Sequence, residues 1–404
     1  MRYWDAVLAF LVAMTVAALL TPLAAALARR IGAVDLPSAR GLSQRVTPRL
    51  GGLAILAGVL VAAALWMPAM IVVPRGVGSR PHTYDTVHTS ALIAGALLIA
   101  IVGAIDDVHR LPPIVKLFGQ VAAAVIAVLG GAVVSDVTLP FIGSLSLPQD
   151  GAWLTVIWLV ALMNVVNFSD GIDGLAAGVC AIDGIAFAVI AFDLQGGASV
   201  AAVLAAITAG AAVGFLVHNF YPARVFMGDS GSNLLGYLLG VVAVIGSLKT
   251  NVVVALVLPL LILAVPFLDT SFVIAKRLKY RQAPWSADAN HFHHRMANIG
   301  FSPRQTVAFL YGWTLMLAGV AIALRFVPYS DHHGHYNLAW SIVMATILVF
   351  ALLVSIYLVY VLEIFKFRHV RANQLRKLDP DTSEHEIEEA VRRDVETGEF
   401  EALR

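Results

Sequence analysis

Long apolar stretches recur along almost the whole chain and alternate with short polar segments. A helix that spans a membrane needs about 20 mostly apolar residues. By this criterion the sequence predicts eleven spanning helices, with apolar cores at Val7–Ala28, Gly51–Val73, Ser90–Ile105, Val115–Val134, Trp153–Val166, Leu175–Leu194, Ala198–Val217, Asn233–Ser247, Val252–Ala275, Thr306–Val327 and Leu338–Phe365. Three of these cores are short for a full span, and we expect the polar motif beside each to continue its helix. The fold class predicted is an all-α integral membrane protein.

Basic residues are distributed unevenly between the two sets of connecting segments. The loops that follow odd-numbered spans, together with the C-terminal tail, hold 22 of the 27 Lys and Arg residues. Cytoplasmic segments of membrane proteins carry the excess of Lys and Arg. We therefore predict a multi-pass protein of the cell (plasma or inner) membrane with its N-terminus outside and its C-terminus cytoplasmic. Residues 1–365 would form the membrane domain and residues 366–404 a cytoplasmic tail.

The amino-acid composition agrees with a membrane protein and argues against several other classes of protein and site. Hydrophobic residues make up 59% of the chain and charged residues 13%, and the mean hydropathy is +0.82. Soluble domains usually carry about 25% charged residues. A formal net charge of +1 gives no support for nucleic acid as a partner. The single cysteine, Cys180, excludes an intramolecular disulfide and a cysteine-rich metal site.

Acidic, amide and histidine residues gather in the loops that the charge distribution assigns to the cytoplasmic face. The residues singled out there are Arg49, Asp106, Asp107, Lys116, Asn164, Asn167, Asp170, Asp173, Phe226, Asp229, His291, His293, His294 and Arg295. Segments that are distant in the sequence would thus bring their polar groups to one membrane face. This convergence predicts a functional site at that face.

The individual motifs indicate phosphate and cation chemistry. Adjacent carboxylates such as Asp106 and Asp107 repel each other, which favours a bound cation or a raised pKa. Asn164 and Asn167 stand three residues apart, as do Asp170 and Asp173, so each pair can share a helix face. Asp229 lies in a Gly- and Ser-rich turn just before a span whose N-terminus would favour an anion. Structural alternatives remain open for each motif, namely a positive-inside loop, a helix-end pair or a solvated loop.

The combined residue types indicate a divalent cation and phosphate groups. Carboxylate oxygens without cysteine favour Mg²⁺, or Mn²⁺, as the cofactor. The cluster of three histidines with Arg295 suits either a transition metal or phosphate oxygens, and the neighbouring basic residues favour phosphate. Phe226 and the Asn/Asp-rich loop can hold a nucleobase. Such an inventory at a membrane face suits phosphoryl transfer from a soluble nucleotide donor to a lipid-borne phosphate.

Five stretches resemble the polyprenyl-phosphate N-acetylhexosamine-1-phosphate transferase family. They are DLPSAR with PRLGG, the Asp106–Asp107 pair with Lys116, NVVNFSDGIDGLAAG, NFYPARVFMGDSGS and HFHHRMANIGFSPRQ, in the family's order from Asp35 to Gln305. The resemblance implies a Mg²⁺-dependent enzyme with a UDP-sugar donor and a polyprenyl phosphate acceptor. It implies that the acceptor phosphate attacks the sugar-linked phosphorus and that UMP is released.

The same resemblance implies roles for individual residues. Asp229, with Asp107, would hold the metal, and Asp106 or Asp107 would deprotonate or orient the acceptor. Uridine would be bound by Asp173, Asn167 and Phe226, and the pyrophosphate by His291, His293, His294 and Arg295. Arg49, Lys116, Asn164 and Asp170 would complete the substrate site.

The H-x-H-H form of the histidine motif resembles the branch that uses UDP-N-acetylglucosamine. That branch would make this enzyme the first membrane step of a cell-envelope polysaccharide, with undecaprenyl phosphate as acceptor. Gly41 and Ser43 depart from the Lys and His usual in that branch, so a muramoyl-pentapeptide donor or another UDP-N-acetylhexosamine remains an alternative. An anion transporter is a remote alternative. Transporters place ionisable residues near the bilayer midplane and often contain internal repeats. In this sequence the polar residues mostly gather at one face, and no repeated halves are seen.

Two features lie outside these motifs. Asp183 falls inside the sixth predicted span, where it is either functional or hydrogen-bonded to a neighbouring helix. In the tail, Ser383 and Glu386 form a capping-box pattern that predicts a short amphipathic helix with Ile387, Val391 and Val395 on one face. This helix would pack on the chain itself, on a second copy in a homodimer, or on another partner.

Overall fold

The computed structural model describes residues 3–36, 46–74, 84–134, 136–139, 143–146, 151–193, 200–247, 263–264, 267, 302–327, 337–360, 376 and 383–397. Its helices are α1 (Tyr3–Ile31), α2 (Gly51–Trp66), α3 (Thr89–His109), α4 (Pro113–Leu129), α5 (Gly151–Ser169), α6 (Leu175–Asp193), α7 (Val200–Asn219), α8 (Gly228–Ser247), α12 (Pro303–Phe326), α13 (Leu338–Tyr360) and α15 (Glu384–Thr397). Its strands are β1 (Val34–Asp35), β2 (Thr47–Pro48), β3 (Met70–Pro74), β4 (Tyr84–His88), β5 (Asp136–Leu139) and β6 (Gly143–Ser146).

Eight of the described helices are long and apolar enough to cross a membrane, and α2 and α4 are shorter apolar helices. Ten of the eleven predicted cores coincide with described helices, while only residues 263–264 and 267 of the core at Val252–Ala275 are described. The protein is therefore a mostly helical, multi-pass membrane protein. The count of eleven spans and the orientation of the termini stay predictions.

Polar motifs extend the three short cores, as expected. The core Ser90–Ile105 belongs to α3, Trp153–Val166 to α5, and Asn233–Ser247 to α8. The extension of α8 begins at Gly228, so Asp229 lies in its first turn. In these three places a polar motif thus contributes residues to one end of a membrane helix.

The predicted cores Gly51–Val73 and Val115–Val134 were longer than the helices that form there. The all-α prediction also needs correction, because short strands are present. Helix α2 ends at Trp66, before Pro68, because a residue preceding proline is disfavoured in the helical conformation. Helix α4 ends at Leu129, just before Gly130 and Gly131. Three antiparallel hairpins, β1–β2, β3–β4 and β5–β6, form in the connections. The apolar β-branched residues of β3 resemble a continuing span in the sequence, which explains the error.

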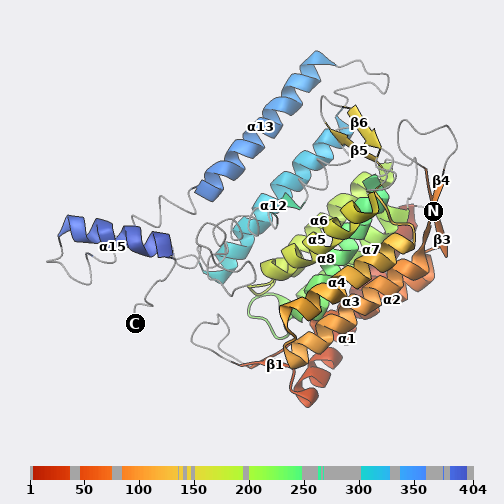
Figure 1. Ribbon diagram of the computed structural model, residues 1–404, viewed down its shortest axis with the longest axis horizontal. Coiled ribbons are helices and arrows are strands. Elements are labelled where there is room, and N and C mark those ends of the chain that lie inside the picture. The colour runs from red at the N-terminus through yellow and green to blue at the C-terminus, as the bar shows by residue number, and fades with distance from the viewer. Residues whose placement is uncertain are drawn as a thin grey trace. The chain divides into compact units, whose positions relative to one another are not determined.

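The chain divides into two compact units. The first contains Met1–Leu268 and Leu310–Val327, and the second contains Asp269–Phe309 and Pro328–Arg404. In the first unit α7 lies at the centre, between α1, α2, α6 and α8 (Figure 1). A Cβ atom at Gly210 of α7 would lie only 2.2 Å from the carbonyl oxygen of Phe10 in α1. Small residues of this kind allow membrane helices to approach closely.

The capping box predicted in the tail is confirmed within the second unit. The hydroxyl of Ser383 donates to Glu386 Oε2 over 2.8 Å, and the Glu386 N–H donates back to Ser383 Oγ over 3.4 Å. Helix α15 begins at the next residue, Glu384, and Ile387 is buried, at 2% exposed. The partner of this tail helix stays a prediction.

Asp183 is fully buried in α6, and neither of its carboxyl oxygens has a hydrogen-bond partner among the described residues. A buried polar group without a partner costs about 1–3 kcal/mol of stability. We expect Asp183→Val to raise the midpoint of thermal unfolding in detergent, because this cost is removed. Asp183→Asn keeps a polar group of the same shape and should gain less. A lower midpoint for Asp183→Val would show that the carboxyl group has a partner after all.

Candidate active site

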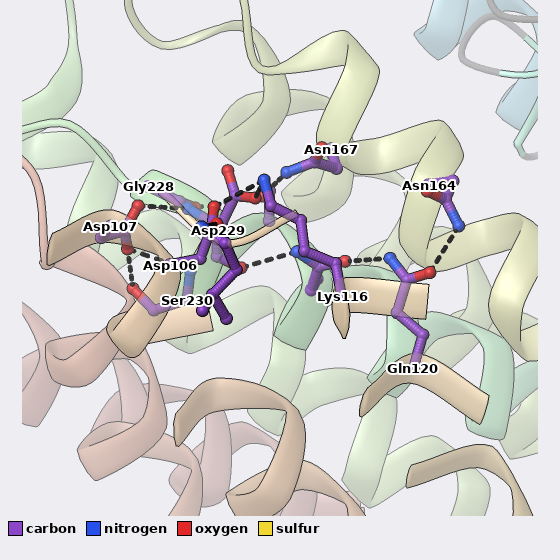
Figure 2. Close-up of polar contacts among 12 residues, drawn as sticks. Asp106, Asp107, Lys116, Gln120, Asn164, Asn167, Gly228, Asp229 and Ser230 are labelled. Atoms are coloured by element: carbon purple, nitrogen blue, oxygen red, sulfur yellow. Dashed lines mark hydrogen bonds and ion pairs between the residues drawn. The ribbon is translucent and has the colours of Figure 1, made fainter. Parts of the chain in front are cut away.

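Polar ends of several helices meet at one end of the first unit. The C-terminal ends of α3 and α5 and the N-terminal ends of α4 and α8 contact one another there through polar side chains (Figure 2). The turn between α5 and α6 reaches the same end of the bundle, because it directly follows the last turn of α5. The structure thus brings described polar residues from separate segments together at one end of the bundle, while their functional role and the membrane face stay predictions.

Lys116 is the centre of this cluster. Its ammonium group lies 2.7 Å from Asp229 Oδ2 and 2.5 Å from Asp106 Oδ2. The turn between α3 and α4 brings Lys116 back, because the Leu111 N–H donates to Asp106 Oδ1 over 2.6 Å and α4 begins at Pro113. Asp106 is 8% exposed, whereas Lys116 is 34% exposed. One partly accessible ammonium group is therefore shared by two carboxylates from different helices.

Asp107 holds the start of α8 instead of facing Lys116. Its Oδ1 accepts a hydrogen bond from the Asp229 N–H over 2.8 Å, and its Oδ2 accepts from the Ser230 N–H over 3.2 Å and from Ser230 Oγ over 2.9 Å. The N-terminus of a helix favours a negative charge. The sequence indicated an anion at this helix start, and in the structure this anion is Asp107. Both oxygens of Asp107 are used in these contacts. Asp107 is therefore better suited to position Asp229 than to act as an open metal ligand.

A chain of amide groups continues from the cluster into the bundle. Asn164 Nδ2 donates to Gln120 Oε1, Gln120 Nε2 donates to Asn233 Oδ1, and Asn233 Nδ2 donates to the Asp229 carbonyl, each over 2.8 Å. Gln120 and Asn233 were not among the residues predicted from the sequence. The sequence contained a signal for both residues. Gln120 follows Lys116 by one helical turn, and Asn233 follows Asp229 by one helical turn, so each shares a helix face with a predicted site residue.

Asn167 contacts the start of α8 from the other side. Its Nδ2 donates to Ser232 Oγ over 2.9 Å, and Ser232 Oγ donates to the Gly228 carbonyl over 3.0 Å. Asn164 and Asn167 both lie on α5, as predicted. Asp170 and Asp173, in contrast, lie in the turn between α5 and α6, so the expectation that they share a helix face was wrong.

Asp173 ties this turn to the segment that leads into α8. Its Oδ2 accepts a hydrogen bond from the Ala223 N–H over 2.8 Å. Gly174, at φ +81°, is held by the Asn219 side chain over 3.0 Å and by the Tyr311 hydroxyl over 2.5 Å. Burial raises the pKa of Asp173, and the hydrogen bond from Ala223 acts against that rise.

Asp170 faces the negative charges of the cluster. Burial, followed by the charges of Asp229 and Asp107, raises the pKa of Asp170 to about 7. The positive charge of Arg49 opposes this rise in pKa. Asp170 is therefore partly protonated at neutral pH, and a bound cation would favour its ionised form.

Two further predicted residues lie beside α2. Arg49 forms an ion pair with Asp35 over 2.9 Å, with both side chains about one third exposed. The Phe226 N–H donates to the Pro48 carbonyl over 2.8 Å, and the Gly51 N–H donates to the Phe226 carbonyl over 3.0 Å. The segment before Asp229 is thereby joined to the start of α2. The predicted residues His291, His293, His294 and Arg295 lie outside the described residues, as do Gly41 and Ser43.

The described residues form no preformed metal site, but their carboxylates can hold a hard divalent cation together with a substrate. Within the described ranges, no group of three or more His, Cys, Asp or Glu residues is arranged as a preformed metal site. Mg²⁺, however, commonly binds through one or two carboxylates together with substrate phosphates and water. Asp170 and Asp229, whose Oδ2 is paired with Lys116, are carboxylates at this cluster that do not cap α8, so the residues present fit such a site.

Comparison with known proteins gives the family. Residues 89–247, which include α3 to α8, match the family model described as glycosyl transferase family 4. The chain is 34% identical to a probable undecaprenyl-phosphate N-acetylglucosaminyl 1-phosphate transferase of Bacillus subtilis, over 79% of this chain and 85% of that protein. It is 38% identical to a decaprenyl-phosphate N-acetylglucosaminephosphotransferase of Mycolicibacterium smegmatis, over 75% and 78%.

A relative whose name specifies a different sugar is also similar. A phospho-N-acetylmuramoyl-pentapeptide-transferase of Desulforudis audaxviator is 33% identical, over 70% of this chain and 86% of that protein. All three names describe transfer of a phosphorylated amino sugar, and the matched family region contains Asp106, Lys116 and Asp229. The chain therefore belongs to glycosyl transferase family 4, among the polyprenyl-phosphate N-acetylhexosamine-1-phosphate transferases.

Proposed function

We propose that this protein transfers N-acetylglucosamine-1-phosphate from UDP-N-acetylglucosamine to a polyprenyl phosphate such as undecaprenyl phosphate, with release of UMP. The observation that carries the proposal is the ammonium group of Lys116 shared by Asp106 and Asp229 at the start of α8. The proposal is supported by the relatives from B. subtilis and M. smegmatis, whose names specify N-acetylglucosamine.

The reaction proposed is a direct displacement at phosphorus. An oxygen of the lipid phosphate forms a bond to the phosphorus that carries the sugar, and the bond from that phosphorus to the oxygen of UMP breaks. Phosphoryl transfer mainly requires positioning and electrostatic stabilisation from the protein. Lys116 would offset negative charge on the phosphates, and Asp106 would orient the acceptor through that same ammonium group.

The proposed cofactor is Mg²⁺, with Mn²⁺ as an alternative. Asp229 and Asp170 would hold it together with substrate phosphates. When bound, the cation would supply positive charge to the pyrophosphate of the donor. Asp107 would contribute indirectly, because its hydrogen bonds fix the backbone of Asp229 and Ser230.

The proposed topology has eleven spans, an external N-terminus and a cytoplasmic tail, and it places the site at the cytoplasmic face of the cell membrane. It is supported by the position of the described site residues, which lie at helix ends or turns next to the loops of the set that carries the excess of Lys and Arg. A charged, water-soluble UDP-sugar would reach the site from that side.

A transfer assay in detergent tests the proposal. It would combine polyprenyl phosphate, Mg²⁺ and labelled UDP-N-acetylglucosamine or UDP-muramoyl-pentapeptide in parallel reactions, and it would follow lipid-linked label and UMP. We expect label from the first donor with one UMP per lipid product. Label from the second donor alone would favour the function named for the D. audaxviator relative. Transfer from neither donor, in folded protein, would contradict the proposal.

Proton release should accompany Mg²⁺ binding near pH 7. A carboxyl group with a pKa of about 7 is about half protonated at that pH, and a bound cation expels the proton. We expect about half a proton per Mg²⁺ at pH 7 and almost none at pH 9. Titration calorimetry in two buffers of different ionisation enthalpy measures this number. Asp170→Asn should remove the release, and an unchanged value in that variant would assign the proton to another group.

A further inference from the structure

Two side-chain contacts join α4 to α8, and they are separated by four residues on each helix. The first is the ion pair between Lys116 and Asp229, over 2.7 Å. The second lies one helical turn further along both helices, where Gln120 Nε2 donates to Asn233 Oδ1 over 2.8 Å. One turn of an α-helix rises about 5.4 Å, so sliding or rotating either helix by one residue would break both contacts. Together they fix the register of α4 on α8.

The amide contact restricts this register more strictly than the ion pair. A lysine side chain is flexible and reaches an oxygen from several directions. Gln120, in contrast, is buried, at 5% exposed, and Asn233 is buried, at 4% exposed. Buried amides must satisfy both their donor and their acceptor groups. Gln120 does so by accepting from Asn164 Nδ2 on α5 (Figure 2). It also donates to Asn233 on α8.

The hydrogen bonds run in one direction and end at the backbone of Asp229, the residue whose side chain is paired with Lys116. Asn164 donates to Gln120, Gln120 donates to Asn233, and Asn233 donates to the backbone carbonyl of Asp229. Hydrogen bonds aligned in one direction polarise and strengthen one another. Helix α4 otherwise packs mainly on α3 and α5. Gln120 is therefore placed to transmit the position of α5 and α8 to Lys116.

We propose that Gln120 is a positioning residue for the transfer reaction, acting through Asn233 and the register of α4 to set where Lys116 meets Asp229. This inference rests on the proposed function, because its consequence is a change in catalytic rate. Gln120 does not contact the reacting groups itself. Its loss should therefore lower the turnover number and leave donor affinity almost unchanged.

Gln120→Met tests the proposal, because methionine keeps the length and approximate volume of the side chain but has no amide. We expect kcat to fall on the order of 10- to 100-fold, since misplacement of a catalytic group by about 1 Å can cost 100-fold. The KM for UDP-N-acetylglucosamine should stay within about 3-fold. The matched control is Thr208→Val in α7, because Thr208 is fully buried and, among the described residues, its hydroxyl donates only to the Leu204 carbonyl of its own helix. Unchanged kcat in Gln120→Met would overturn the proposal.

A double-mutant cycle separates positioning through Lys116 from general damage. In a Lys116→Met background, Gln120→Met should lower the remaining kcat by less than about 3-fold, because the group that it positions is already absent. If the two substitutions act independently, their effects on kcat multiply, and Gln120 does not act through Lys116.

Hydrogen exchange distinguishes failure of this inference from failure of the proposed function. In the full-length protein in detergent, Gln120→Met should speed amide exchange in the first turns of α8, and Thr208→Val should not. This readout needs no substrate. Absence of transferase activity in the wild-type protein would contradict the proposed function alone. Unchanged amide exchange in α8 of Gln120→Met would contradict the positioning role of Gln120.

Discussion

Asp229→Asn is expected to abolish transfer, with kcat/KM lowered by about 1,000-fold or more. Asparagine has the same shape, and the backbone N–H of residue 229 can still donate to Asp107. The substitution removes the negative charge that faces Lys116 at 2.7 Å, and with it the proposed carboxylate ligand of Mg²⁺. The remaining activity should also depend less steeply on Mg²⁺ concentration. Initial rates at several Mg²⁺ concentrations measure both effects.

Asp5→Asn is the matched control for this variant. Asp5 lies in the first turn of α1, as Asp229 lies in the first turn of α8, but at a helix end that none of the site residues reaches. Its replacement should leave the rate within about 2-fold, because Asp5 lies apart from the cluster around Lys116. Both variants should keep the thermal midpoint of the wild type within a few degrees. Full activity in Asp229→Asn would refute the metal and electrostatic roles of this carboxylate.

Gly103→Ala should disrupt both the site and the packing around it. A Cβ atom at Gly103 in α3 would lie 2.5 Å from the Cα and N atoms of Ser230 at the start of α8. These are backbone atoms, so no side chain can rotate away, and α8 must shift. Overpacking of this kind costs about 1–3 kcal/mol. We expect a lower thermal midpoint and a loss of transfer on the order of 100-fold, since the shift moves Asp229 relative to Lys116.

Gly319→Ala gives the comparison for Gly103→Ala. Gly319 is also inside a membrane helix, α12, but a Cβ atom there would meet nothing within 4 Å among the described residues. Alanine stabilises a helix interior by about 0.5–1 kcal/mol relative to glycine. Activity should therefore be unchanged, and the thermal midpoint should be equal or slightly higher. Equal losses in both variants would mean that close packing of α3 on α8 is not the cause.

The sequence predicted the charged part of the site because charge stands out in an apolar chain. Lys116, Asp106 and Asp229 were selected for that reason, and the structure brings them together. Gln120 and Asn233 are neutral amides inside apolar helices, so their importance depends on which helices meet, and that information lies in the packing. The same limit applies to Asp107, since only the structure shows that its partner is the backbone of α8.

The helical architecture was predictable because a stretch of about 20 apolar residues in a membrane forms an α-helix, which satisfies its backbone hydrogen bonds internally. The ends of the elements were harder to predict. The residues of β3 are as apolar as those of α2, and what separates them is Pro68 and the pairing of β3 with β4, a contact between distant residues. The turn that carries Asp170 and Asp173 was read as helix because its spacing fits a helix, whereas its glycines allow a tight turn held by Asn219 and Tyr311.

The carboxylate of Asp107 at the start of α8 has a consequence for inhibitor design. In nucleotide-binding proteins that cradle phosphate on a helix start, a phosphate mimic gains its affinity from free backbone N–H groups. Here the N–H groups of Asp229 and Ser230 are already bonded to Asp107. A phosphate mimic aimed at them would have to displace an internal anion, and it would meet the charge of Asp229 beside it. Compounds developed against phosphate-cradling loops should therefore bind this protein poorly, and selective compounds should take their affinity from its side chains.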